Sequence, residues 1–208
     1  CQNGHVSICD WLYKVGAAED INRTDNEGWT RMHIACSNGH LPVCEWLYEM
    51  GAIKDICKVN DIGYTPMHWA CFQGHLSLCK WLYSAGANED ITKTNSWGGT
   101  PMLLACHRGH LPVCKWLYEM GAAEDIRKQD DDGDTPIFRA CQGGHLPVCH
   151  WLVSNGALNA PPAVVGHVDH AMVLFETRKC RTDGSALTRR PALLAWAQGV
   201  VAAHHAFR

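Results

Sequence analysis

The sequence lacks a long apolar run, a secretory signal and a strong net charge, and each absence excludes a class of protein. Its most apolar stretch, "ALLAWAQGVVAA", contains Gln198 and is shorter than the roughly 18–20 residues of a membrane-spanning helix. The N-terminus has no basic segment followed by an apolar one, so we expect no signal peptide. A formal net charge of -3 gives no reason to expect nucleic acid or a membrane surface as partner. The chain also begins without an initiator methionine, which suggests a piece of a longer protein.

The residues that are present are those of a folded globular protein. Apolar residues make up 47% of the chain and charged residues 19%, a balance that disordered chains do not have. The charge is unevenly divided, because residues 1–157 hold 12 Lys and Arg against 18 Asp and Glu, whereas residues 158–208 hold 6 against 3. This shift in composition predicts a boundary near residue 157.

Ten of the twelve cysteines fall into two columns with a spacing of 35 residues. One column is Cys1, Cys36, Cys71, Cys106 and Cys141, and the other is Cys9, Cys44, Cys79, Cys114 and Cys149. Neighbours in a column lie one whole repeat apart, beyond the roughly 7 Å between Cα atoms that a disulfide tolerates. We therefore interpret these cysteines as small buried residues of a protein in a reducing compartment.

The same period of 35 residues governs the whole segment, which predicts two short helices and a loop in each repeat. Thr65-Pro66, Thr100-Pro101 and Thr135-Pro136 each offer a capping hydroxyl followed by a proline at the first helical position. A glycine about eight residues later ends that helix, and a second helix starts near Leu111-Pro112 and stops at Gly121. Helices this short are unstable alone, so each repeat must pack between its neighbours, as in solenoid proteins.

The segment "GYTPMHWACFQGHLSLCKWLYSAGANEDI" resembles an ankyrin repeat, and the resemblance covers residues 1 to about 157 in register. It implies an all-α ankyrin-repeat solenoid of stacked helix-turn-helix units with hairpin-like loops. The units are 25–59, 60–94, 95–129 and 130–157, preceded by a truncated unit, 1–24. Residues 158–208 form a divergent tail in which "RRPALLAWAQGVVAAHHAF" predicts a helix over 191–207. The repeat is longer than the usual one of about 33 residues, and we place the extra residues in a surface loop, where lengthening is tolerated.

Two departures from the family pattern concern the first helix of each unit. Arg31 stands where the other units have the proline of the Thr-Pro pair. Leu103 and Phe138 replace the histidine that His33 and His68 provide, and which in ankyrin repeats bonds to the neighbouring Thr-Pro turn. We therefore expect units three and four to substitute apolar packing for this polar contact.

A catalytic reading is available for His110 and Cys114, which have the spacing of a base and a nucleophile. The same spacing recurs in all five units, whereas a reactive thiol needs one special environment, so we interpret the pair as structural. The column of Trp11, Trp46, Trp81, Trp116 and Trp151 could bind a ligand, but its helical spacing favours packing between repeats. His167, His170, Cys180, His204 and His205 offer metal-binding side chains without a recognisable spacing, so we assign no metal and no cofactor.

Positions that differ between units while the frame stays fixed are candidates for recognition, and in ankyrin proteins they line the concave face that binds partners. An aromatic patch on units one to three would continue into the acidic segment "DDDGD" at 130–134. We predict that a partner protein binds Glu27, Trp29, Ile62, Tyr64, Trp69, Phe72, Trp97, Arg108, Asp132, Asp134 and Arg139.

The function predicted from these observations is that of a non-catalytic protein–protein interaction module or scaffold, intracellular and cytoplasmic. The alternative is a targeting or adaptor portion of a longer enzyme or membrane protein. A third possibility is that the tail is itself a small catalytic or metal-binding element. We expect a protein partner of unknown identity, and neither nucleic acid nor membrane.

Overall fold

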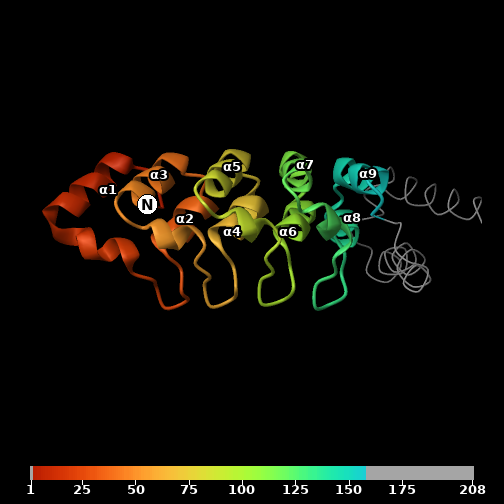
Figure 1. Cartoon of the computed structure of the whole chain (residues 1–208), viewed down its shortest axis with the longest axis horizontal. Coiled ribbons are helices and arrows are strands. Elements are labelled where there is room, and N and C mark those ends of the chain that lie inside the picture. The colour runs from red at the N-terminus through yellow and green to blue at the C-terminus, as the bar shows by residue number, and fades with distance from the viewer. Residues whose placement is uncertain (1, 158–208) are drawn as a thin grey trace, which may run out of the picture.

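The computed structural model describes residues 2–157, and its helices form two rows along one axis (Figure 1). The first row is α2 (Arg31–Ser37), α4 (Pro66–Gln73), α6 (Pro101–Arg108) and α8 (Pro136–Gly143). The second row is α1 (Val6–Leu12), α3 (Leu41–Glu49), α5 (Leu76–Ser84), α7 (Leu111–Glu119) and α9 (Leu146–Ser154). No strand occurs within residues 2–157, which confirms the all-α solenoid for this part. The predicted tail, 158–208, and its helix, 191–207, lie outside the described residues.

Each first-row helix begins and ends at the residues that the sequence indicates. The Thr100 hydroxyl accepts the backbone N–H of Leu103 at 3.2 Å, and Pro101 fills the first helical position. The helix ends at Gly109, which has a left-handed φ of 80°. Helix α2 starts at Arg31 without a proline because Thr30 still caps it by accepting from His33. The capping threonine therefore suffices to start the helix.

The terminating glycine is also required by close packing between units. A Cβ atom placed on Gly74 would lie 2.5 Å from Nδ1 of His110, a residue of the next unit. The His110 ring occupies this space because its Nε2 donates to the carbonyl of Phe72 at 3.1 Å. One glycine thus serves both the left-handed backbone turn and the stacking of neighbouring units.

Short turns connect the second-row helices to the loops. Segments Ile53–Ile56, Asn88–Ile91 and Ala123–Arg127 are 3-10 helices, each with a buried isoleucine and a buried aspartate. Helix α1 instead runs into a kinked π turn, Tyr13–Ala17, with a φ of 116° at Gly16, and a 3-10 helix, Ala18–Asn22. Contacts run along the rows, α2 against α4, α4 against α6 and α6 against α8, so each unit buries the next.

The two cysteine columns face one another inside each unit, which the spacing argument did not predict. The Sγ–Sγ distance is 3.6 Å for Cys36 and Cys44, and 3.4 Å for Cys141 and Cys149. These residues are buried, and the ten described cysteines are free thiols. The columns therefore pack as a ladder of thiols between the two helix rows.

The tryptophan column packs between units, as its spacing predicts. Tyr48 contacts Trp81 edge to face with ring centroids 5.9 Å apart, and Tyr83 contacts Trp116 in the same way. Trp46 and Trp116 are buried. Trp11 differs from them, with 61% of its surface exposed.

Candidate functional site

The loops between units are held in shape by one Asp or Asn side chain each. Asp25 Oδ1 accepts the backbone N–H groups of Glu27 and Trp29, and Asn95 Oδ1 accepts those of Trp97 and Gly99, all at 2.9–3.0 Å. Asn60 and Asp130 serve the same purpose in the other two loops. The spacing of 35 residues between these four positions is visible in the sequence, but their role as loop braces was not predicted.

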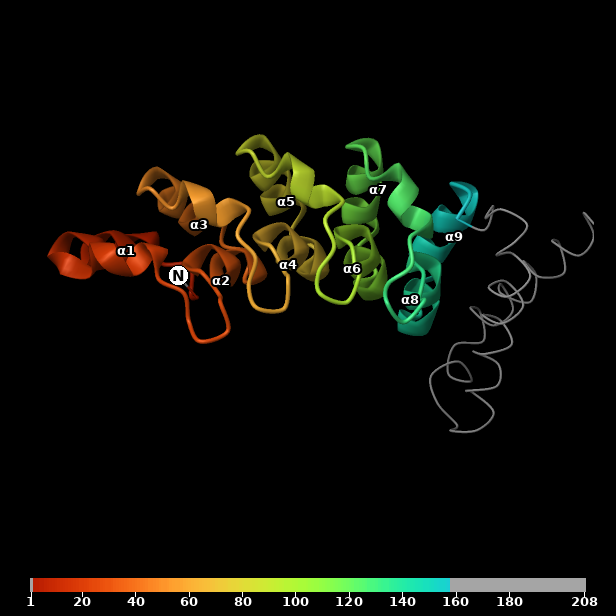
Figure 2. The same cartoon turned by 60° about the horizontal axis from the view of Figure 1, so that its bottom comes forward.

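Neighbouring loops are joined through their backbones. Asp61 N donates to the Glu27 carbonyl at 3.1 Å, Ser96 N to that of Ile62 at 3.2 Å, and Asp131 N to that of Trp97 at 3.0 Å. Figures 1 and 2 show the four loops projecting side by side on one side of the array. We call loops 25–29, 60–64, 95–99 and 130–134, with the adjoining sides of the first-row helices, the hairpin face.

Two histidines attach the first-row helices to this face. His68 Nδ1 accepts the N–H of Thr65 at 3.1 Å, so Nε2 carries the proton and donates to the Lys93 carbonyl at 3.0 Å. His33 makes the equivalent bonds to Thr30 and the Tyr64 carbonyl. Burial lowers the pKa of both imidazoles to about 4, so both rings are neutral at physiological pH.

The aromatic residues predicted to form a patch are in contact. Trp69 lies at the centre, with its ring centroid 4.5 Å from Trp29, 4.8 Å from Tyr64 and 5.9 Å from Phe72. Tyr64 in turn meets Trp97 edge to face at 6.0 Å. Trp97 is 53% exposed, whereas the other four rings are partly buried by one another. Trp97 is therefore the ring of this row most available to a partner.

Helix α6 contributes a cation and an imidazole beside Phe72. The Arg108 guanidinium carbon lies 4.3 Å from the Phe72 ring centroid, a cation–π contact. The His107 imidazole stacks on the same Phe72 ring, with centroids 6.5 Å apart and planes at 13°. Burial, followed by the charges of Arg139 and Arg108, lowers the pKa of His107, which keeps this imidazole neutral.

The acidic end of the face is less negative than "DDDGD" alone indicates, because one cation pairs with its carboxylates. Arg139 on α8 binds Asp130 at 2.8 Å, Asp134 at 3.0 Å and Asp132 at 3.6 Å. Burial opposes its ionisation, but the hydrogen bond to Asp130 and the three carboxylate charges raise the pKa of Arg139 above its usual value. Arg139 therefore fixes the shape of this loop as well as its charge.

A groove lies between the last two loops, with a cavity volume of about 360 Å³. Five of the predicted residues line it, namely Tyr64, Phe72, Trp97, Asp132 and Arg139, together with Asn95, Gly99, Leu103, Leu104, His107 and Asp130. Trp29 and Trp69 extend the aromatic row beyond this groove, and Arg108 joins it through Phe72. Glu27 and Ile62 sit at exposed loop tips outside it, and Asp134 belongs to it only through Arg139.

Half of the groove-lining residues that sequence reasoning did not select belong to α6, namely Leu103, Leu104 and His107. Leu103 and Leu104 are buried. His107 is not among the residues predicted to bind a partner. Its neighbour relation to Phe72, 35 residues earlier, was the signal that would have selected it.

The histidine and cysteine pairs are not assembled as nucleophile and base. His110 and His145 direct Nε2 at backbone carbonyls of the preceding unit, and Cys114 contacts Cys106 at 3.6 Å. Burial raises the pKa of Cys106 well above its usual range, and the adjacent Cys114 raises it further. The Cys106 thiol is therefore protonated, and both side chains are buried, which supports the structural interpretation.

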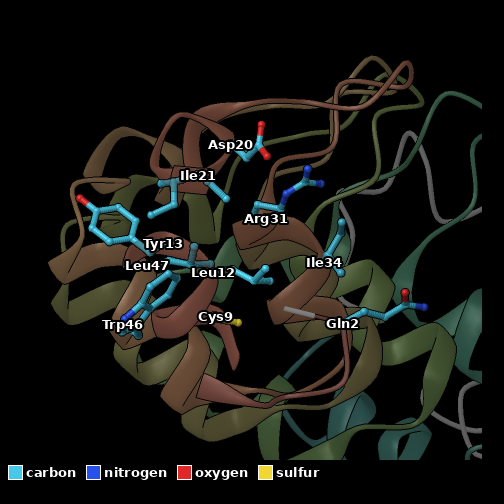
Figure 3. Close-up of a pocket in the computed structure, with 11 residues that line it drawn as sticks. Gln2, Cys9, Leu12, Tyr13, Asp20, Ile21, Arg31, Ile34, Trp46 and Leu47 are labelled. Atoms are coloured by element: carbon cyan, nitrogen blue, oxygen red, sulfur yellow. The ribbon is translucent and has the colours of Figure 1, made fainter. Parts of the chain in front are cut away.

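A second hollow, of about 330 Å³, lies at the N-terminal end of the array (Figure 3). Cys9, Leu12, Ile34 and Leu47 line its apolar part, with Asp20 and Arg31 at its rim. In the other units the corresponding side of the first-row helix is covered by the helix before it, as α2 covers α4. This hollow therefore lies where the described residues contain no first-row helix before α2.

Residues 2–157 contain neither a candidate membrane span nor a candidate metal site. Over this range no helix combines the length and apolar character of a membrane span, and no group of three or more His, Cys, Asp or Glu side chains converges as metal ligands would.

Comparison with known families gives one result. A family model described as ankyrin repeats (3 copies) matches residues 1–95 and also residues 87–161, well over half of the chain. The search of curated proteins found no match.

Proposed function

The chain belongs to the ankyrin-repeat family, and we propose that it is a non-catalytic interaction module whose hairpin face binds a partner protein. Ankyrin repeats are in general protein–protein interaction modules, so the family supports the broad role. Fold alone does not choose a surface. The choice of face is our inference from the side chains that the array presents there.

The observation that carries the proposal is the exposed ring of Trp97 at a loop tip. A large apolar side chain with 53% of its surface in water contributes little to the core, whereas aromatic residues of this kind are common energetic centres of interfaces. Trp97 is held by an ordered loop, since its N–H and carbonyl are both hydrogen-bonded, so binding would cost little ordering entropy.

The test is a pull-down of a partner with the full chain, followed by affinity measurement on two variants. Trp97→Ala is expected to weaken binding by on the order of 2 kcal/mol or more. It should change the free energy of unfolding by no more than about 0.5 kcal/mol. Trp11→Ala is the matched control, because Trp11 is 61% exposed but lies on α1, away from the hairpin face.

The proposal fails if Trp11→Ala and Trp97→Ala weaken the partner equally, or if neither does. An array that unfolds on Trp97→Ala would show instead that this ring belongs to the core.

A further inference from the structure

The groove between loops 95–99 and 130–134 is lined by two chemically different groups of side chains. One group is the rings of Tyr64, Phe72 and Trp97, and the other is the carboxylates of Asp130 and Asp132 with Arg139. Aromatic faces and carboxylates share one preference, because both attract cations. The combination is therefore suited to a side chain that is positively charged and partly apolar.

The protein's own arginines show this chemistry on the same surface. Arg108 lies over the face of Phe72 at 4.3 Å, and Arg139 is held by Asp130, Asp134 and Asp132. One guanidinium is thus bound by a ring and the other by carboxylates. Both guanidinium groups have their partners within the chain, and they show that this surface binds arginine side chains.

A third position with both kinds of partner is open. Trp97 is 53% exposed, and the Asp132 side chain is 84% exposed and makes the longest of the three contacts to Arg139, at 3.6 Å. An exposed carboxylate at this distance loses little interaction energy with Arg139 when it turns towards another cation. Trp97 and Asp132 both line the groove, so both belong to the surface that an entering side chain would contact.

The surrounding charge also favours a cationic ligand. Loops 25–29, 60–64, 95–99 and 130–134 contain seven Asp and Glu residues and no Lys or Arg. The last loop contains four aspartates, three of which pair with the single guanidinium of Arg139. His107, the remaining basic group in the groove, is kept neutral by its lowered pKa. The net charge around the groove is therefore negative.

We propose that this groove receives an arginine side chain of a partner's basic peptide segment, its guanidinium stacked on Trp97 and paired with Asp132. The inference rests on the proposed function, because it assumes that the hairpin face is the binding surface. Arginine fits better than lysine, since a planar guanidinium stacks on a ring and offers a fork of donors to a carboxylate.

The experiment selects random linear displayed peptides on the full chain and measures the affinity of the best binder. We expect arginine to be enriched at one position, and replacement of that arginine by the neutral isostere citrulline to weaken binding at least about tenfold. Trp97→Ala should weaken it comparably. Asp132→Asn should weaken it severalfold and reduce its dependence on salt, since one charge pair is removed. Trp11→Ala should leave it unchanged.

The outcomes separate the two proposals. Peptides that lose affinity with Trp97→Ala but contain no arginine, or tolerate citrulline, overturn the arginine site and leave the hairpin face as the binding surface. Peptides indifferent to both Trp97→Ala and Asp132→Asn count against the face itself. A selection on the full chain that returns no binder overturns the arginine site.

Discussion

Replacement of His68 by leucine should make the array less sensitive to acid. His68 is fully buried, and its unprotonated Nδ1 accepts the Thr65 N–H. When Nδ1 is protonated, it can no longer accept this hydrogen bond. In the unfolded chain the same ring titrates near its ordinary pKa of 6.5, whereas in the folded array burial lowers the pKa to about 4. Between these values the unfolded state binds more protons, so stability falls as the pH falls.

The size of the effect follows from the two pKa values. Near pH 5 the unfolded ring is almost fully protonated and the folded ring almost fully neutral, which costs about 2 kcal/mol relative to pH 8. His33, with the same bonds and the same lowered pKa, adds a similar amount. The fold accepts leucine at this position, because Leu103 occupies it in α6 under the same threonine cap.

The assay is urea denaturation of the wild type and His68→Leu at pH 8 and at about pH 5. At pH 8 the variant should be less stable by about 1–3 kcal/mol, since Thr65 N–H loses its acceptor and Lys93 its donor. On acidification the wild type should lose about 2 kcal/mol more than the variant. All other titrating groups are common to both proteins, so the difference isolates His68.

A reverse substitution gives the matched control. Leu103→His places an imidazole under the cap of α6, where burial should add acid sensitivity. If wild type and His68→Leu lose the same free energy between the two pH values, His68 is not a buried neutral acceptor and the reasoning is wrong.

Three further predictions concern buried groups of the array. Asp125→Asn should stabilise the protein by about 1–3 kcal/mol at pH 8 but not near pH 4. Burial raises the pKa of the Asp125 carboxyl to about 6, so its contribution to stability is lost as the pH rises through that value. Equal effects at both pH values, measured by urea denaturation, would contradict this prediction. Cys79→Ser buries a hydroxyl in the stack and should lower the free energy of unfolding by about 1–3 kcal/mol. Cys57 is partly exposed, so Cys57→Ser should change the free energy of unfolding by no more than about 0.5 kcal/mol. A larger loss for Cys57→Ser than for Cys79→Ser would show that Cys79 is not the core residue of the two. Amide hydrogen exchange should show lower protection in α1 than in α4 to α7, because Trp11 and Leu12 are exposed. Equal protection of all these helices would refute the prediction that stability differs along the stack.

Much of the architecture could be predicted because a repeat reports the same local rules several times. The Thr-Pro starts, the glycine stops and the apolar second helices are local features, and they locate α4 to α9 within a residue or two. The period of 35 residues then requires stacking, because no helix of this length is stable alone. The exposed ring of Trp97 was predictable for the same reason, since it is a large apolar residue in a turn.

What sequence reasoning could not determine were the contacts between units, whose residues lie far apart in the chain. Cysteines eight residues apart proved to face one another because the two helices of a unit fold back together. Arg139 offsets part of the negative charge of loop 130–134, because α8 brings its guanidinium against Asp130 and Asp134. The groove itself exists only because Tyr64, Leu104 and Asp132 come from three successive units.

The sequence by itself therefore determined the family, the helices and the periodic frame, since these follow from local propensity repeated in register. Only the tertiary structure decided which side chains share a surface. That surface depends on the angle at which one unit packs against the next, and this angle arises from all the contacts of the stack together.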